Sequence, residues 1–235
     1  MEATSNSVGS VTNTPVRVQD LRITYDQAVL TEDMLAADPF SQFTAWFAEA
    51  SAGTILEPNA MVLSTVAASG QPSSRTVLLK DISAAGFTFF TNLTSTKSQQ
   101  ITANPQVSLL FPWYELHRQV IVTGEAELLS RDAVQEYFHS RPRESQIGAW
   151  VSDQSSDIES RDYLDERFEN VTREFATVEP IPVPDFWGGW LVRASSIEFW
   201  QGRPSRLHDR LVFRCSTADA DLTEAAQWTV QRLSP

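Results

Sequence analysis

The sequence has little cysteine, few basic residues and no long hydrophobic run, and each shortage excludes a class of protein. Its one cysteine, Cys215, rules out an intramolecular disulfide framework and a multi-cysteine zinc site. We expect Cys215 to be a small hydrophobic residue in a strand, in a chain of the reducing cytosol. No stretch reaches the roughly 18 apolar residues of a membrane span, and the N-terminus lacks the basic and apolar regions of a secretory signal.

Acidic residues outnumber basic ones by 30 to 18, so the formal net charge is -12. This balance argues against nucleic acid or an anionic membrane as the main partner. It still allows an anionic small molecule, because a local group of arginines and lysines can bind phosphate on an acidic protein. The hydrophobic content of 42% is typical of a globular domain with a buried core.

The pattern of predicted elements favours a single β-rich domain. Residues 1–20 are rich in serine, threonine and asparagine, which predicts a disordered tail before one domain over 21–235. A helix is expected over 40–50, capped by Asp38 with Pro39 in its first turn. Gly124 is a candidate bulge, and a kink is expected at Gly188 and Gly189. Strands are predicted over 60–68, 74–81, 86–92, 107–113, 119–129, 187–200, 211–214 and 228–233, and helices over 95–103, 130–139, 146–150 and 160–177. Many short strands with a few outer helices indicate a mainly β, α+β fold with a closed or nearly closed barrel.

A first group of basic and hydroxyl residues surrounds a predicted helix start. Arg75 and Lys80 lie on one strand, Thr91 ends the next, and Ser95, Thr96 and Lys97 begin a helix. A helix N-terminus with hydroxyls and a lysine favours an anion. Arg75 and Lys80 are five residues apart and so lie on opposite strand faces. The alternative is ordinary solvated surface charge.

A second group is Tyr137, Arg141, Arg143 and Ser145. Tyr137 and Arg141 are four residues apart and share a helical face. Tyrosine, arginine and serine together are typical of a phosphate pocket. An interface or a capping network is the other interpretation.

A third group is Arg206, His208 and Arg210, which alternate and share one side if the segment is extended. Two arginines and a histidine on one side suit an electron-rich anionic ring. His117 and His139 are expected to be structural. The sequence contains no GxGxxG before a helix, no P-loop, no HExxH and no GxSxG.

Several longer segments resemble the pyridoxamine 5'-phosphate oxidase family, in order from about Leu21 to the closing RLSP. They include RTVLLK, FFTNLTSTK, NPQVSLLFPW, RQVIVTGEAELLS, YFHSRPRESQIGAWVSDQSS, PDFWGGW and IEFWQGRPSRLHDR. The resemblance implies an FMN-binding split β-barrel and a homodimer with two FMN sites at the subunit interface. It implies neither a metal nor a nucleic-acid or membrane partner.

By the same resemblance, individual residues receive roles. One subunit would line FMN with Arg75, Lys80, Phe90, Thr91, Lys97 and Gln119, and the other would reach it with Gln154, Ser155, Trp200 and Arg210. The substrate phosphate would be bound by Lys80, Tyr137, Arg141 and Ser145. Arg206 and His208 would lie over the substrate ring as catalytic residues, and Arg22 and Tyr25 would belong to a segment that closes over the substrate.

The implied activity is oxidation of the 4' carbon of pyridoxamine or pyridoxine 5'-phosphate to give pyridoxal 5'-phosphate, with O2 reduced to H2O2, in the cytoplasm. One departure concerns the cofactor. The family often has Arg-Lys where this chain has Thr96 and Lys97, so a phosphate contact would be missing and FMN would bind more weakly. The alternatives are another split-barrel flavin oxidoreductase, such as a phenazine-pathway oxidase, or a carrier without turnover.

Overall fold

The computed structural model describes residues 24–25, 28–215, 217 and 219–235. The expected disordered tail over residues 1–20 and the candidate substrate residue Arg22 lie outside these ranges. None of the helices in the described ranges has the length and apolar character needed to cross a membrane.

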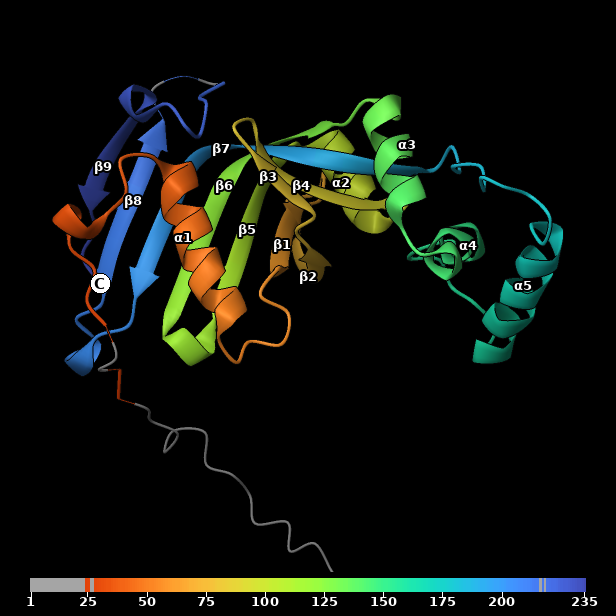
Figure 1. Ribbon diagram of the computed structural model, residues 1–235, viewed down its shortest axis with the longest axis horizontal. Coiled ribbons are helices and arrows are strands. Elements are labelled where there is room, and N and C mark those ends of the chain that lie inside the picture. Colours follow the sequence, from red (N-terminus) through yellow and green to blue (C-terminus); the bar gives the residue numbers. More distant parts are fainter. Residues whose placement is uncertain (1–23, 26–27, 216, 218) are drawn as a thin grey trace, which may run out of the picture.

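Nine strands of the described chain form one antiparallel sheet that curls into a half-barrel (Figure 1). Its order is β2-β1-β5-β6-β7-β4-β3, with β8 added to β7 and β9 to β8. The strands are β1 (Ala60–Val66), β2 (Pro72–Leu78), β3 (Asp81–Ser83), β4 (Gly86–Asn92), β5 (Gln106–Trp113), β6 (Arg118–Leu128), β7 (Trp187–Gln201), β8 (Asp209–Cys215) and β9 (Trp228–Arg232).

The long strand β7 organises the sheet because it changes neighbours along its length. Its first half pairs with β4 from Trp187 to Val192, and its second half pairs with β8 from Ser196 to Gln201. Strand β6 follows β7 along both halves. The two ends of β7 therefore carry different parts of the molecule.

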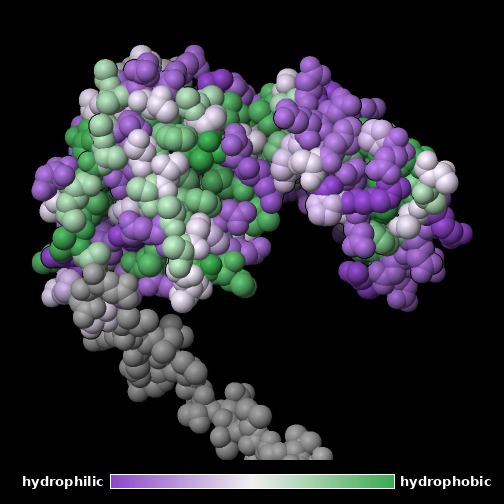
Figure 2. Space-filling view, in the orientation of Figure 1, coloured by the Kyte–Doolittle hydropathy of each residue, from purple (hydrophilic) through white to green (hydrophobic). Residues whose placement is uncertain are grey.

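The described chain also contains five α-helices: α1 (Pro39–Ala52), α2 (Thr96–Ala103), α3 (Arg131–Ser140), α4 (Arg143–Val151) and α5 (Arg161–Glu174). As predicted, Asp38 caps α1 by accepting a hydrogen bond from the Ser41 amide at 2.7 Å, with Pro39 in the first turn. Helices α3, α4 and α5 lie at the end of the molecule opposite β8 and β9 (Figure 1). The surface over α4 and α5 is largely hydrophilic, and a hollow separates them from the barrel (Figure 2).

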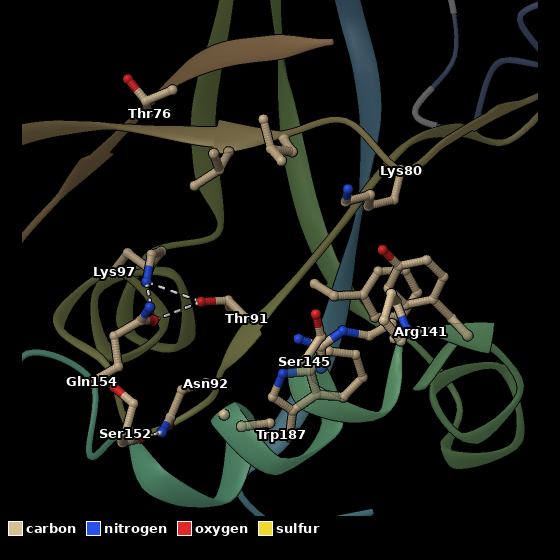
Figure 3. A pocket seen from close by; sticks show the side chains of 17 residues that line it. Thr76, Lys80, Thr91, Asn92, Lys97, Arg141, Ser145, Ser152, Gln154 and Trp187 are labelled. Carbon is tan, nitrogen blue, oxygen red and sulfur yellow. Dashed lines mark hydrogen bonds between the residues drawn. The ribbon is translucent and has the colours of Figure 1, made fainter. Parts of the chain in front are cut away.

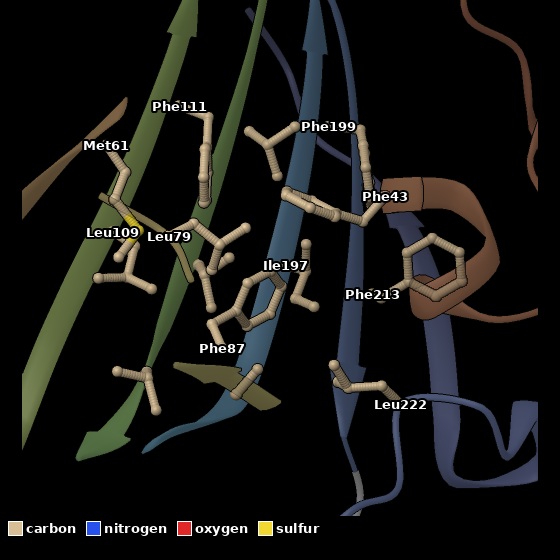
Figure 4. Packing of buried hydrophobic residues seen from close by; sticks show 14 of the residues in the cluster. Phe43, Met61, Leu79, Phe87, Leu109, Phe111, Ile197, Phe199, Phe213 and Leu222 are labelled. Carbon is tan, nitrogen blue, oxygen red and sulfur yellow. The ribbon is translucent and has the colours of Figure 1, made fainter. Parts of the chain in front are cut away.

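The main core lies between α1 and the concave sheet (Figure 4). Phe43 of α1 is fully buried, and its ring lies edge-on to Phe87 and to Phe111 at 5.0 Å in each case. A smaller core of Val134, Phe138, Ile147, Trp187 and neighbouring apolar residues attaches α3 and α4 to the start of β7. Cys215 is half-buried against the main core, as expected.

Glycines in two strands show where close packing excludes a side chain. The bulge predicted at Gly124 is confirmed by a register shift between Thr123 and Gly124, and a Cβ there would lie 1.9 Å from the Arg193 carbonyl oxygen. The kink expected at Gly188 and Gly189 is wrong, because both continue the regular ladder with β4. The short strand β3 was not predicted.

Candidate cofactor and substrate site

One cavity of about 590 Å³ lies where β2, β4 and α2 meet the helices α3 and α4 (Figure 3). It brings together side chains that are far apart in the sequence. The predicted site residues that line it are Lys80, Phe90, Thr91, Lys97, Tyr137, Arg141, Ser145 and Gln154. Residues of the first and second sequence groups therefore share one site.

Lys97 defines one end of the cavity. It sits in the first turn of α2, nearly buried, and its Nζ donates to Thr91 Oγ1 at 2.9 Å, Ser95 Oγ at 3.0 Å and Gln154 Oε1 at 2.5 Å. Burial, and then repulsion from Arg75, lower the Lys97 pKa to about 8. Within the described chain, no carboxylate pairs with this ammonium group. A buried cation with only neutral partners is a strong site for an anion.

Arg75 lies behind this end and is not among the residues that line the cavity. Its guanidinium donates to the Leu63 carbonyl at 3.2 Å, to Thr65 Oγ1 at 2.6 Å and to Ser73 Oγ at 2.7 Å. Burial lowers the Arg75 pKa. Arg75 therefore does not contact the cavity, but its positive charge acts electrostatically on Lys97, which does.

Arg141 defines the other end (Figure 3). Its guanidinium lies 4.8 Å from the centre of the Trp187 ring, and burial lowers its pKa. Its Nη1 is buried and has no hydrogen-bond partner among the described residues. A buried donor left without a partner costs about 1–3 kcal/mol. A ligand oxygen at this position would remove that cost.

Flat aromatic rings line the cavity beside Arg141. Phe90 stacks on Tyr137 with ring centres 3.9 Å apart and on Trp187 at 5.4 Å, with the planes inclined by 16° and 10°. Arg143, in contrast, points away from the cavity and donates to the carbonyls of Phe175 and Val178. The contacts of Arg143 therefore support a structural role, and not a place in a phosphate pocket.

A second group of predicted residues lies at the far end of β7. Gln119 faces Trp200 across β6 and β7, and Trp200 faces Arg210 across β7 and β8. The start of β7, at Trp187, lines the cavity. At about 3.3 Å per residue, some 40 Å of strand separates Trp187 from Trp200. One chain therefore does not bring this second group to its own cavity.

The division of the FMN residues between subunits needs correction. The resemblance implies that Gln119 shares a subunit with Lys97, and Gln154 with Trp200. Within the chain, however, Lys97 donates a hydrogen bond to Gln154, and Gln119 lies opposite Trp200. Ser155 follows Gln154 in an exposed turn with a φ of 75° and does not line the cavity. The resemblance implies which residues line the site, but contacts within the chain decide which of them lie together in one subunit.

Aromatic and histidine side chains gather around Trp200. The Tyr25 ring lies edge-on to His117 at 4.5 Å and to His208 at 5.7 Å, and the His208 ring is 4.6 Å from Trp200. Burial, and then the charge of Arg206, lower the His208 pKa. His117, expected to be structural, thus contacts a predicted substrate residue, and no sequence motif distinguished it.

Arg206, His208 and Arg210 would share one side only in an extended segment, and the segment is not extended at Arg206. Pro204–Arg206 forms a 3-10 turn in which Ser205 and Arg206 have φ values of 58° and 63°, and β8 begins only at Asp209. Arg206 is exposed and does not continue the strand of Arg210. Arg210 instead binds Glu198 through two hydrogen bonds of 2.7 and 2.9 Å.

These features define an antiparallel half-barrel protein with an interior site for a flat anionic ligand, and comparisons with known proteins specify the class. A family model described as pyridoxamine 5'-phosphate oxidase matches residues 47–173, and one described as the pyridoxine 5'-phosphate oxidase C-terminal dimerisation region matches residues 187–235. The chain belongs to the pyridoxamine 5'-phosphate oxidase family.

Individual relatives agree with this assignment. The chain is 52% identical over 88% of its length to a pyridoxine/pyridoxamine 5'-phosphate oxidase of Dichelobacter nodosus, covering 93% of that protein. It is 50% identical to the protein of the same name from Acidothermus cellulolyticus, over 88% of this chain and 90% of the relative.

Solved structures show the same fold, so the expected split β-barrel with flanking helices is confirmed. PhzG from Burkholderia lata, solved with tetrahydrophenazine-1-carboxylic acid, superimposes with a TM-score of 0.78 at 25% identity, over 88% of this chain and 98% of PhzG. A pyridoxamine 5'-phosphate oxidase-related, FMN-binding protein from Nostoc punctiforme gives a TM-score of 0.67 at 14% identity, over 86% of this chain and all of that one.

Proposed function

We propose that the protein is an FMN-dependent oxidase that converts pyridoxine or pyridoxamine 5'-phosphate to pyridoxal 5'-phosphate and reduces O2 to H2O2. The observation that carries this proposal is a single cavity with a cationic group at each end and stacked aromatic rings in its wall. Two cationic ends suit two phosphorylated molecules, a cofactor and a substrate. The names of the relatives at about 50% identity support the same activity.

The Lys97 end fits the phosphate of FMN. Lys97 Nζ and Thr91 Oγ1 are donors at this end, where both donate to Gln154 Oε1, and Arg75 adds a second positive charge behind them. FMN held there would supply the redox chemistry, which is transfer of a hydride from the substrate's 4' carbon and onward transfer of the electrons to O2. The protein would hold the cofactor and the substrate in register, which is its main contribution to the rate.

The Arg141 end fits the phosphate of the substrate. The unpartnered Nη1 of Arg141 supplies a charge-assisted donor, and Ser145, Tyr137 and Lys80 lie on the same cavity wall. This contact fixes the far end of the substrate and leaves the reacting carbon free. With the alcohol substrate, one O2 gives one aldehyde and one H2O2. With the amine substrate, one water is also consumed and ammonia is released.

The second group of residues would complete the cavity from a second copy of the chain. Gln119, Trp200 and Arg210, with Arg206, His208 and Tyr25 nearby, lie too far along β7 to reach their own cavity. The match of residues 187–235 to a dimerisation region supports a homodimer in which each copy contributes to both sites. We expect sedimentation to show a dimer that loses flavin on dissociation. A flavin-loaded, active monomer at micromolar concentration would contradict this arrangement.

Reconstitution with FMN followed by turnover tests the function. The apoprotein should bind FMN, and the loaded protein should form equal amounts of pyridoxal 5'-phosphate and H2O2 from pyridoxine 5'-phosphate in air. Failure to bind FMN in excess would overturn the cofactor assignment. Flavin binding without oxidation of either phosphorylated substrate would favour a carrier, and turnover of a phenazine carboxylic acid instead would favour the alternative oxidase.

A further inference from the structure

Gln100 is a half-buried residue of α2 whose side chain joins three residues of β1 and β2. Its Oε1 accepts from Thr65 Oγ1 at 2.5 Å, from Ser73 Oγ at 2.8 Å and from Arg75 Nη2 at 3.4 Å. None of the roles that the resemblance implies falls on Gln100. Its one amide oxygen nevertheless accepts hydrogen bonds from three side chains of the neighbouring strands.

The chemistry of the partners fixes the direction of every hydrogen bond in this network. Arg75 can only donate, and it donates to the hydroxyls of Thr65 and Ser73 at 2.6 and 2.7 Å. Each hydroxyl then has its own proton left to donate to Gln100. An acceptor at the position of the Gln100 oxygen is therefore required to close the network around the guanidinium.

Every acceptor around Arg75 in the described chain is neutral. They are two hydroxyls, one amide and the Leu63 carbonyl. Several other arginines in the described chain pair with carboxylates, as in Arg118 with Glu49 and Arg232 with Glu32. A chain with 30 acidic residues could have supplied a carboxylate here as well. A carboxylate would orient Arg75 equally well but would cancel its charge.

The charge of Arg75 is felt inside the cavity. After burial, its repulsion is the second cause that lowers the pKa of Lys97. Lys97 itself has only neutral partners, so the two cations stand close together without a counter-charge. Such a pair is unfavourable in the empty protein and becomes favourable when a dianionic phosphate arrives.

We propose that Gln100 is a positioning residue for phosphate binding: its neutral amide holds Arg75 in place behind Lys97 while leaving the positive charge of Arg75 available to the ligand. This inference rests on the proposed FMN site. It predicts that substitutions of Gln100, which does not line the cavity, can change the charge around Arg75 and the orientation of Arg75 independently.

Gln100→Glu tests the charge, because glutamate keeps the acceptor and the chain length but pairs with Arg75. We expect FMN to bind at least tenfold more weakly, measured by quenching of flavin fluorescence on titration with apoprotein. The matched control is Gln99→Glu, which places the same charge on the neighbouring, exposed position of α2. FMN affinity in the control should stay within twofold of the unaltered protein.

Gln100→Met tests the orientation, because methionine keeps the size and removes the acceptor without adding charge. We expect a smaller loss of affinity than in Gln100→Glu. If Gln100→Glu does not fold, Ser73→Asp brings a carboxylate to Arg75 from β2 and should weaken FMN binding to a similar degree. Thermal unfolding of each apoprotein establishes that the folded states are comparable.

The outcomes separate this inference from the proposed function. If the unaltered protein does not bind FMN, the proposed function fails. If the unaltered protein binds FMN and Gln100→Glu binds it equally well, the inference is overturned. It is also overturned if Gln99→Glu loses as much affinity as Gln100→Glu, or if Gln100→Met does, since the loss would then not depend on cancelling the charge of Arg75.

Discussion

Removing the Arg141 side chain should weaken substrate binding through the phosphate and leave the chemical step largely intact. In the structure the Arg141 Nη1 is buried and free of partners among the described residues, so a phosphate oxygen can take the full strength of its hydrogen bond. A hydrogen bond to a charged group contributes about 1.5–3 kcal/mol. Arg141→Ala should therefore raise KM for pyridoxine 5'-phosphate by about 10- to 150-fold.

The reason for expecting an effect on KM is the distance between the phosphate and the reacting carbon. A contact that is equally strong in the ground state and in the transition state changes KM and not kcat. Arg141 also packs on the Trp187 ring at 4.8 Å, and this packing is lost whatever the substrate. The informative quantity is thus the ratio of kcat/KM for pyridoxine 5'-phosphate to that for unphosphorylated pyridoxine.

The assay is initial-rate H2O2 formation by protein shown to be fully loaded with FMN. The ratio of the two kcat/KM values should fall by at least tenfold in Arg141→Ala. Arg143→Ala is the matched control, because Arg143 is two residues away and donates to backbone carbonyls outside the cavity. An unchanged ratio in Arg141→Ala, or an equal fall in Arg143→Ala, would refute the placement of the substrate phosphate.

Three further predictions concern the cofactor and the ring. Thr96→Arg, at the exposed first residue of α2, should tighten FMN binding by at least tenfold, because a charge-assisted bond of about 1.5–3 kcal/mol becomes available; an unchanged or weaker dissociation constant would contradict this. FMN binding should weaken as pH rises through about 8, since Lys97 loses its proton there in the free protein, and Lys97→Arg should remove that dependence. Arg206→Met and Arg206→Lys should both slow flavin reduction under nitrogen in protein loaded with FMN, because a lysine ammonium cannot replace a planar guanidinium over the substrate ring. Wild-type rates and wild-type substrate affinity in both variants would show that Arg206 is not an active-site residue.

Local features of the fold were predictable because neighbouring residues decide them. The start of α1 follows from the side chain of Asp38 and the fixed φ of Pro39, both of which act within one turn. The bulge at Gly124 follows from a glycine in an otherwise continuous strand pattern. The turn at Pro204–Arg206 was missed because alternating residues look the same in a strand and in an irregular loop.

Within the site, the sequence alone determined which residue types could bind an anion, and only the tertiary structure decided which of them do. Arg141 and Arg143 carry the same side chain two residues apart, yet packing turns one towards the cavity and the other towards backbone carbonyls. A strand over 187–200 is predicted from the local pattern, but only the tertiary structure shows that its Trp187 end lines the cavity while Trp200 lies at the other end. Gln100 acquires its role only because α2 lies against β1 and β2, with Thr65, Ser73 and Arg75 converging on its oxygen. Side-chain chemistry is a property of single residues, whereas the charge and partners around each one depend on contacts between distant segments.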